Sequence, residues 1–164
     1  ELFFLEAFRS ARKRIWIASP YFVPDEQIVG ALELARLRGV EVRVLLPGKV
    51  EHLTVHLASY GYYPLAERIG MEIYRYQPGF LHQKVMLVDD DLVSVGTANL
   101  DNRSFRLNFE LSLVAWDRAF AREIEAMLEE DFGQSRRIAP GELDERSFWF
   151  RFGVSLSRLL GPIL

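Results

Sequence analysis

The chain has no cysteine among its 164 residues. This absence excludes a thiol nucleophile, a disulfide framework and a cysteine-based zinc site, but it does not fix the cellular compartment. The sequence also lacks a recognisable signal peptide and any apolar run that approaches the ~20 residues needed to span a bilayer. It starts at Glu1 and not at a methionine. We therefore expect a fragment, anchored to a membrane by parts that lie outside this sequence.

The chain also has no excess of positive charge, because it contains 20 Lys and Arg and 23 Asp and Glu, which gives a net charge of −3. This balance argues against non-specific binding to nucleic acid, so we do not expect nucleic acid as a partner. It says little about lipids, because a local basic patch can coexist with an acidic total. A hydrophobic content of 49% with 26% charged residues is ordinary for one globular domain.

Strand and helix patterns alternate along the chain. A buried strand at 15–18, an amphipathic helix at 25–38 and a strand at 41–46 predict a βαβ unit with a parallel pair of strands. The other predicted elements are a helix at 1–12, a helical stretch at 51–69 broken near Gly61 and Pro64, strands at 71–76, 85–88, 92–95 and 110–116, and a helix at 117–132. Together they predict an α/β fold, a layered αβα domain with a mixed, largely parallel sheet. We place this domain at residues 1–140 and an amphipathic tail at 141–164.

The stretch 82–110 predicts a β-hairpin whose outer ends are polar. His82 and Lys84 precede the first strand and point to the same side, because side chains alternate along extended chain. Asn99 follows the second strand after Gly96, where the chain can bend closely around a ligand. An imidazole, a fixed cation and an amide donor are a set suited to handling a phosphate.

Residues 82–99 also resemble the HKD signature of the phospholipase D superfamily, with the spacing His82-x-Lys84-x4-Asp89-x6-Gly96-Thr97-x-Asn99. One departure is Thr97, where the family usually has Ser, and the hydroxyl is kept. Segments at 20–26, 78–84, 99–110 and 158–164 resemble the second catalytic half of bacterial cardiolipin synthases. The resemblance covers nearly the whole chain, and it implies a phospholipase D-like fold.

The resemblance implies a set of site residues, which are catalytic His82, Lys84, Asp89, Asn99 and Glu110 and substrate-binding Gly96 and Thr97. Glu110 would orient the imidazole of His82 through its other nitrogen. Asp89 lies a full strand away from His82, so we expect it to hold the hairpin or to pair with a basic residue. No metal or cofactor is expected, because fixed cations can neutralise a phosphate and the three adjacent acids at 89–91 cannot all converge on one ion.

Double displacement at phosphorus needs two histidines, of which one attacks and the other protonates the leaving oxygen and then activates the incoming alcohol. This chain carries one motif, so we expect a second HKD half as a partner, either a homodimer mate or an N-terminal part of the same polypeptide. The resemblance favours the N-terminal part and gives His82 the acid/base role, although a nucleophilic role stays open. It implies a phosphatidyl transferase at the cytoplasmic face of the inner membrane, which joins two phosphatidylglycerols into cardiolipin through a phosphohistidine and releases glycerol.

Two alternatives remain open. Water and an alcohol differ only as acceptors, so a phospholipase D-type phosphodiesterase or a nuclease acting as a homodimer could use the same scaffold. The acidic balance disfavours the nuclease. A catalytically silent half that only completes an interface is the other alternative, and the presence of His82, Lys84, Asn99 and Glu110 together argues against it.

Two further patterns bear on ligands and partners. His52 and His56 lie one helical turn apart, but no third metal ligand is evident, so we interpret them as surface or capping residues. The resemblance leaves a substrate contact open for His52. From Arg146 onward an apolar stripe is interspersed with arginines, which is typical of a helix in a membrane interface or of a terminal helix docked on its own domain or on the missing half.

Overall fold

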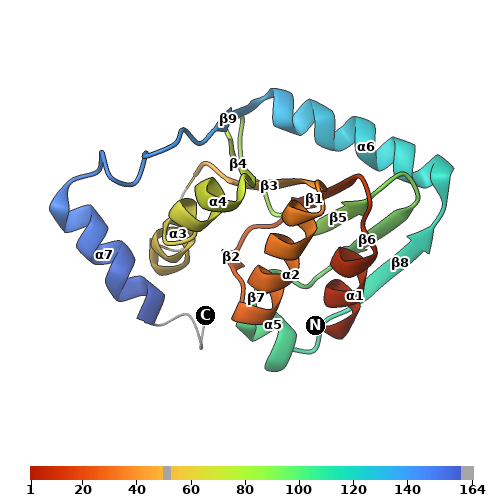
Figure 1. Ribbon diagram of the computed structural model, residues 1–164, viewed down its shortest axis with the longest axis horizontal. Coiled ribbons are helices and arrows are strands. Elements are labelled where there is room, and N and C mark those ends of the chain that lie inside the picture. The colour runs from red at the N-terminus through yellow and green to blue at the C-terminus, as the bar shows by residue number, and fades with distance from the viewer. Residues whose placement is uncertain (50–52, 160–164) are drawn as a thin grey trace.

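The computed structural model describes residues 1–49 and 53–159 (Figure 1). Its strands are β1 (Arg14–Ala18), β2 (Phe22–Val23), β3 (Glu41–Pro47), β4 (Glu72–Tyr76), β5 (Val85–Val88), β6 (Leu92–Gly96), β7 (Leu100–Asp101), β8 (Ser112–Trp116) and β9 (Ser135–Arg137). Its helices are α1 (Leu2–Ser10), α2 (Glu26–Leu37), α3 (Leu53–Tyr60), α4 (Tyr63–Ile69), α5 (Asn102–Arg106), α6 (Arg118–Gly133) and α7 (Phe148–Leu159).

Within the described residues, seven strands form one mixed sheet in the order β8-β6-β5-β1-β3-β4-β9. The predicted βαβ unit is confirmed, since β1 pairs in parallel with β3 and α2 forms the connection between them. Parallel pairing in this sheet is limited to β1–β3 and β3–β4, which is less than we expected, and the other pairs are antiparallel. Strands β5 and β6 are antiparallel because a tight turn connects them, and a tight turn can join only antiparallel strands.

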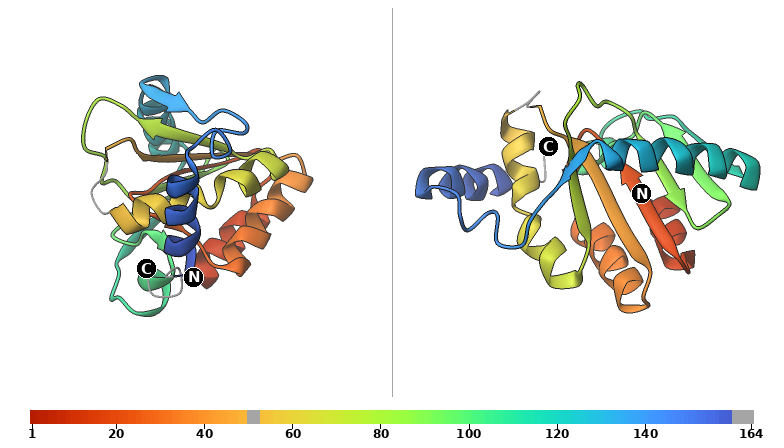
Figure 2. Two further views of the ribbon diagram at one scale, coloured as in Figure 1. Left: turned by 90° about the vertical axis from the view of Figure 1, so that its left-hand side faces the viewer. Right: turned by 90° about the horizontal axis from the view of Figure 1, so that it is seen from above.

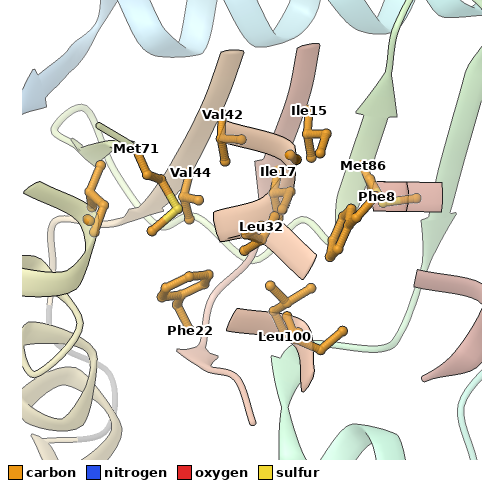
Figure 3. Packing of buried hydrophobic residues seen from close by; sticks show 14 of the residues in the cluster. Phe8, Ile15, Ile17, Phe22, Leu32, Val42, Val44, Met71, Met86 and Leu100 are labelled. Carbon is orange, nitrogen blue, oxygen red and sulfur yellow. The ribbon is translucent and has the colours of Figure 1, made fainter. Parts of the chain in front are cut away.

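Helices cover both faces of the sheet, as the predicted layered α/β fold requires (Figure 2). Side chains alternate along β1, so Ile15 and Ile17 belong to a cluster that includes residues of α1, α2 and α4, whereas Trp16 and Ala18 pack with α6. Figure 3 shows the first cluster, in which Phe8 and Leu32 from the helices meet the strand residues. Because β1 is buried on both faces, its sequence is a continuous apolar run from 15 to 18 without polar alternation.

Several short elements were not predicted from the sequence. Strands β2 and β7 form a separate parallel pair, and α5 follows β7 directly. These elements are two to five residues long, so they are too short to show a hydrophobic period. They matter for the site because the chain between β6 and β8 passes through β7 and α5.

The tail forms helix α7, which lies next to α3 at one end of the molecule (Figures 1 and 2). Val154 is buried in the same hydrophobic cluster as the helices α1, α2 and α4, and Phe150 packs against that cluster. Of the alternatives left open for the tail, docking on its own domain therefore describes one face of α7. Among the described residues there is no helix with the length and apolar character needed to cross a bilayer.

The β5–β6 turn is fixed to the entry of β1 by Asp89. Its carboxylate accepts hydrogen bonds from the backbone N–H groups of Arg12 (3.0 Å), Lys13 (2.7 Å) and Arg14 (3.1 Å). The backbone N–H of Asp89 donates to the carbonyl of Arg14 at 3.0 Å. Asp89 has a φ of 53°, a left-handed conformation that aspartate and asparagine tolerate better than other side chains. The structural role expected for Asp89, holding the hairpin, is confirmed.

We predict that Asp89→Ala lowers the free energy of unfolding by about 2 kcal/mol, because three backbone N–H groups at the entry of β1 lose their acceptor and alanine is strained at this φ. Asp89→Asn keeps the backbone preference and one acceptor oxygen, so we expect a loss of about 1 kcal/mol. Urea unfolding followed by tryptophan fluorescence measures both.

The matched control is Asp91→Ala in the same turn. Asp91 contributes a backbone oxygen, which accepts from the N–H of Asp117 at 2.8 Å and is retained in the variant. We expect a change within about 0.5 kcal/mol. Equal midpoints for Asp89→Ala and Asp91→Ala would show that the carboxylate of Asp89 does not fix the turn.

Candidate active site

The register of the sheet brings the predicted site segments together at one end of strands β5, β6 and β8. Val85, the first residue of β5, lies opposite Ala18 at the end of β1 and opposite Val95 near the end of β6. Gly96 in turn lies opposite Ser112, the first residue of β8. The residues just before β5, just after β6 and just before β8 are therefore neighbours, although up to 28 positions separate His82 from Glu110 in the sequence.

His82 and Lys84 form the first side of this site. The ammonium of Lys84 donates to the carbonyl of His82 at 2.9 Å, and the carbonyl of Lys84 accepts from the N–H of Gly96 at 3.1 Å. The imidazole of His82 is exposed and stacks on the ring of Phe80, with centroids 5.3 Å apart and planes 10° apart. Stacking restricts the orientation of an imidazole while leaving its nitrogens at the edge of the ring accessible.

Glu110 precedes β8 and is held by neutral hydrogen-bonding partners, namely Thr97, Asn108 and Ser104. The hydroxyl of Thr97 donates to one carboxylate oxygen at 2.5 Å, and the amide of Asn108 donates to the other at 3.0 Å. Partial burial raises the pKa of Glu110, but the hydrogen bonds from Thr97 and Asn108 outweigh this effect and hold the pKa below its usual value. The positive charge of Lys84 acts in the same direction. Glu110 is therefore an anion near neutral pH, close to Lys84.

Thr97 contacts the start of β8 in a second way. Its hydroxyl accepts from the N–H of Leu111 at 3.0 Å, and its own N–H donates to the carbonyl of Leu111 at 2.9 Å. The substrate-binding role expected for Thr97 stays a prediction, and its observed contacts position Glu110. The role expected for Glu110, orienting the imidazole of His82, also stays a prediction.

Asn99 lies between β6 and β7. Its backbone N–H donates to the hydroxyl of Ser104 at 3.0 Å, while its side-chain oxygen is buried and has no hydrogen-bond partner among the described residues. A buried amide without a partner is unfavourable unless water or a ligand completes it. Ser104 is itself fixed, since its N–H donates to the carboxylate of Asp101 at 2.7 Å as part of the cap of α5.

Two predicted site residues serve the packing of the sheet. Asp89 lies at the far end of β5 from His82, so we correct its place in the catalytic set: its carboxylate binds the backbone at the entry of β1. At Gly96, a Cβ atom would lie 2.3 Å from the carbonyl oxygen of Leu111 and 2.8 Å from Cα of Ser112. Glycine is required there by the close approach of β8, and the contact with a ligand that we expected stays a prediction.

Sequence reasoning missed Phe80 and Asn108 as supports of the site. Phe80 precedes His82 by two residues in extended chain, and this spacing is the signal that could have indicated a same-side neighbour. For Asn108, no local pattern indicated a contact, because it depends on the turn that follows α5.

Of the two histidines that lie one helical turn apart in the sequence, the structure describes His56. His52 lies outside the described residues. His56 stacks edge-on against Tyr60, and burial together with the charges of Arg75 and Arg146 lowers its pKa to about 4. It is therefore neutral near pH 7. Residues 1–49 and 53–159 contain no group of three or more His, Asp or Glu placed to hold a metal ion.

Solved structures share this fold at low sequence identity. Nuc from Salmonella typhimurium, described as a phospholipase D family member, superposes with a TM-score of 0.73 at 23% identity, over 84% of this chain and 89% of Nuc. The phosphatidylserine synthase of Haemophilus influenzae superposes with a TM-score of 0.78 at 15% identity, over 98% of this chain and 44% of that protein. These likenesses confirm the phospholipase D-like fold.

Sequence comparison is more specific. Cardiolipin synthase A of Pseudomonas putida is 54% identical over 163 residues, which are 99% of this chain and 34% of the relative. Cardiolipin synthase A of Pseudomonas aeruginosa is 53% identical over the same length. The chain thus spans about a third of the length of these relatives. The family described as "Cardiolipin synthase, PLD-like domain" matches residues 4–132. The chain belongs to this family of phospholipase D-like cardiolipin synthase domains.

Proposed function

We propose that the chain is one catalytic half of a phosphatidyl transferase that joins two phosphatidylglycerols into cardiolipin and releases glycerol. The observation that carries the proposal is the meeting of His82, Lys84 and Glu110 at one edge of the sheet, with Glu110 held as an anion. Membership of the cardiolipin synthase domain family supports the lipid substrate.

The site combines the charges that a phosphodiester requires. A phosphodiester repels nucleophiles because it is anionic, so a catalyst must first neutralise its non-bridging oxygens. Lys84 would supply the positive charge and Asn99 a neutral polar contact. The unpaired buried oxygen of Asn99 is an acceptor, so it would take a hydroxyl of the glycerol headgroup, whereas the amide N–H of Asn99 would be the donor to a phosphate oxygen. Glu110 would hold the imidazole of His82 in one tautomer and stabilise its protonated form.

The reaction divides into two displacements. The histidine of a second HKD half attacks phosphorus, a P–N bond forms, and the bond from phosphorus to the glycerol oxygen breaks while His82 donates a proton to that oxygen. The second phosphatidylglycerol then presents a headgroup hydroxyl, His82 takes its proton, and the new P–O bond forms as the P–N bond breaks. His82 thus ends in its starting protonation state.

An exposed apolar face supports the docking of the second half beside this site. Strand β8 is an edge strand, and the segment that leads into it exposes large apolar side chains at Leu107, Phe109, Leu111 and Leu113, while Trp116 is exposed on the other face of the strand. An apolar edge strand is usually covered in a finished assembly. We propose that the second HKD half, an N-terminal part of the full protein, packs over this face and brings its histidine to His82.

Placement in the cell follows from the proposed substrate. Phosphatidylglycerol is a membrane lipid, so the complete protein would work at the cytoplasmic face of the inner membrane, held by segments outside this chain. We also propose the division of the chain into a catalytic half-domain at 1–140 and a tail at 141–164.

The proposal is tested by incubating the complete two-half protein with phosphatidylglycerol, with phosphatidylcholine and with single-stranded DNA. We expect cardiolipin and free glycerol from phosphatidylglycerol alone. Formation of phosphatidic acid without cardiolipin would instead indicate a hydrolase, and cleaved DNA would indicate a nuclease. No product from any substrate would indicate a silent half.

We predict that His82→Ala in the complete protein lowers turnover by about 10²- to 10⁴-fold, because one group serves as acid in the first displacement and as base in the second. The imidazole is exposed and stacks on the ring of Phe80, which is itself exposed, so the fold should be unchanged by circular dichroism. A variant that keeps most of its activity would remove His82 from the mechanism.

Thr97 offers a matched pair of variants for the role of Glu110. Thr97→Val removes the hydroxyl that donates to Glu110, so we expect the pKa of Glu110 to rise and turnover to fall roughly tenfold. Since the carboxylate must be ionised, the loss should be greater at about pH 5 than at about pH 8. Thr97→Ser keeps a hydroxyl and should retain the wild-type pH profile. If Thr97→Val and Thr97→Ser give the same profile, the hydrogen bond does not control Glu110.

A further inference from the structure

Helix α7 carries two apolar stripes, of which its own domain covers one. At about 100° per residue, Phe150, Val154 and Ser157 fall on the side that faces α3, and Val154 and Ser157 are buried. The other stripe occupies a separate arc of about 100° and consists of Phe148, Trp149, Phe152, Leu156 and Leu159, all of them more than half exposed.

The exposed stripe is built around aromatic contacts that do not cover it. Phe148 and Trp149 meet edge-on at 5.5 Å between centroids, and Phe152 lies 6.4 Å from each of them. These rings contact one another while remaining between 54% and 76% exposed. The stripe is therefore a surface that the described part of the chain leaves open.

Charge on this helix has one sign. Helix α7 contains Arg151 and Arg158 and no acid, in a chain of net charge −3. Arg151 lies 3.6 Å from Asp144, and Arg146, just before the helix, pairs with Glu142. Arg151 and Arg158 fall on the arc next to the exposed stripe, and both are exposed. Arg158 also lies over the ring of Tyr62, with 5.8 Å to the centroid, which fixes the helix against its domain.

The second exposed apolar surface of the molecule has the opposite charge pattern. The segment 107–117 along β8 contains Glu110 and Asp117 and no basic residue. An anionic surface would attract the arginines beside the stripe of α7 and repel the carboxylates along β8. Aromatic and aliphatic side chains flanked by arginines are the composition of helices that lie in the interface of anionic bilayers.

We propose that the exposed stripe of α7 binds the surface of an anionic phospholipid bilayer and so holds the catalytic half against the membrane that contains its substrate. The inference deepens the proposed function, since phosphatidylglycerol is both the substrate and the anionic lipid. The helix lies in the interface with Trp149 and Phe152 among the headgroups and acyl chains, while Phe150 and Val154 keep it docked on α3.

Tryptophan fluorescence gives a local test on the 164-residue chain. Trp16 is buried, so the Trp116→Phe variant leaves Trp149 as the exposed reporter. We expect a blue shift of its emission with vesicles of equal parts phosphatidylglycerol and phosphatidylcholine, and quenching by brominated acyl chains. With phosphatidylcholine vesicles the shift should be absent. The converse variant, Trp149→Phe, reports on Trp116 at β8 and should show no quenching.

Sedimentation with the same vesicles tests the side chains. Phe148→Gln combined with Phe152→Gln should weaken binding roughly tenfold or more. The matched control is Leu111→Gln combined with Leu113→Gln, which removes two similarly exposed apolar side chains from β8 and should change binding by less than about twofold. Binding should also fall as salt is raised, because it depends on surface charge.

Four outcomes would overturn the proposal. They are no shift of Trp149 with vesicles, equal binding to phosphatidylcholine alone, equal loss in the two double variants, or a shift that depends on protein concentration without lipid, which would indicate a second copy of the chain on the stripe. His82→Ala separates this inference from the proposed function. The variant should bind vesicles like wild type while losing cardiolipin synthesis. A wild-type complete protein that binds vesicles but makes no cardiolipin would refute the proposed function and leave the proposed membrane surface standing.

Discussion

The active site depends on the register of three antiparallel strands. His82 and Lys84 precede β5, Asn99 follows β6, and Glu110 precedes β8, so these groups meet only because Val85 lies opposite Val95 and Gly96 lies opposite Ser112. A slip by one residue would turn every side chain of a strand to the other face of the sheet and would separate the groups. Register is therefore the constraint on which the proposed chemistry rests.

Two features fix this register from opposite ends of the strands. At the turn, the carboxylate of Asp89 holds three backbone N–H groups at the entry of β1. At the site, Gly96 leaves no room for a side chain against Leu111, and Thr97 bonds to Leu111 through both its backbone and its hydroxyl. The same hydroxyl reaches Glu110, so the contact that aligns β8 also positions a charged group of the site.

Two of the exposed apolar surfaces among the described residues, the edge of β8 and the stripe of α7, differ in charge. The edge of β8 lies beside the site and carries only acids, which suits a protein partner that completes the site. The charged residues of α7, next to its apolar stripe, are both arginines, which suits an anionic lipid surface. A half-enzyme that needs both a second histidine and a substrate drawn from a bilayer would use one surface for each.

The sequence by itself determined the order and type of the main elements and indicated which residues suit phosphate chemistry, since apolar periodicity and motif spacing are local properties of the chain. It predicted the βαβ unit, the hairpin 85–95 and the set His82, Lys84, Asn99 and Glu110. Only the tertiary structure decided what each residue contacts. In the structure Asp89 lies away from the site, the hydroxyl of Thr97 donates to Glu110, and Phe80 stacks on His82. These contacts depend on strand register and on the path of the chain through β7 and α5, so the sequence alone did not predict them. The tertiary structure also settled that α7 docks by one stripe and leaves another exposed, since the division of an amphipathic helix between two surfaces depends on how its neighbour α3 approaches it.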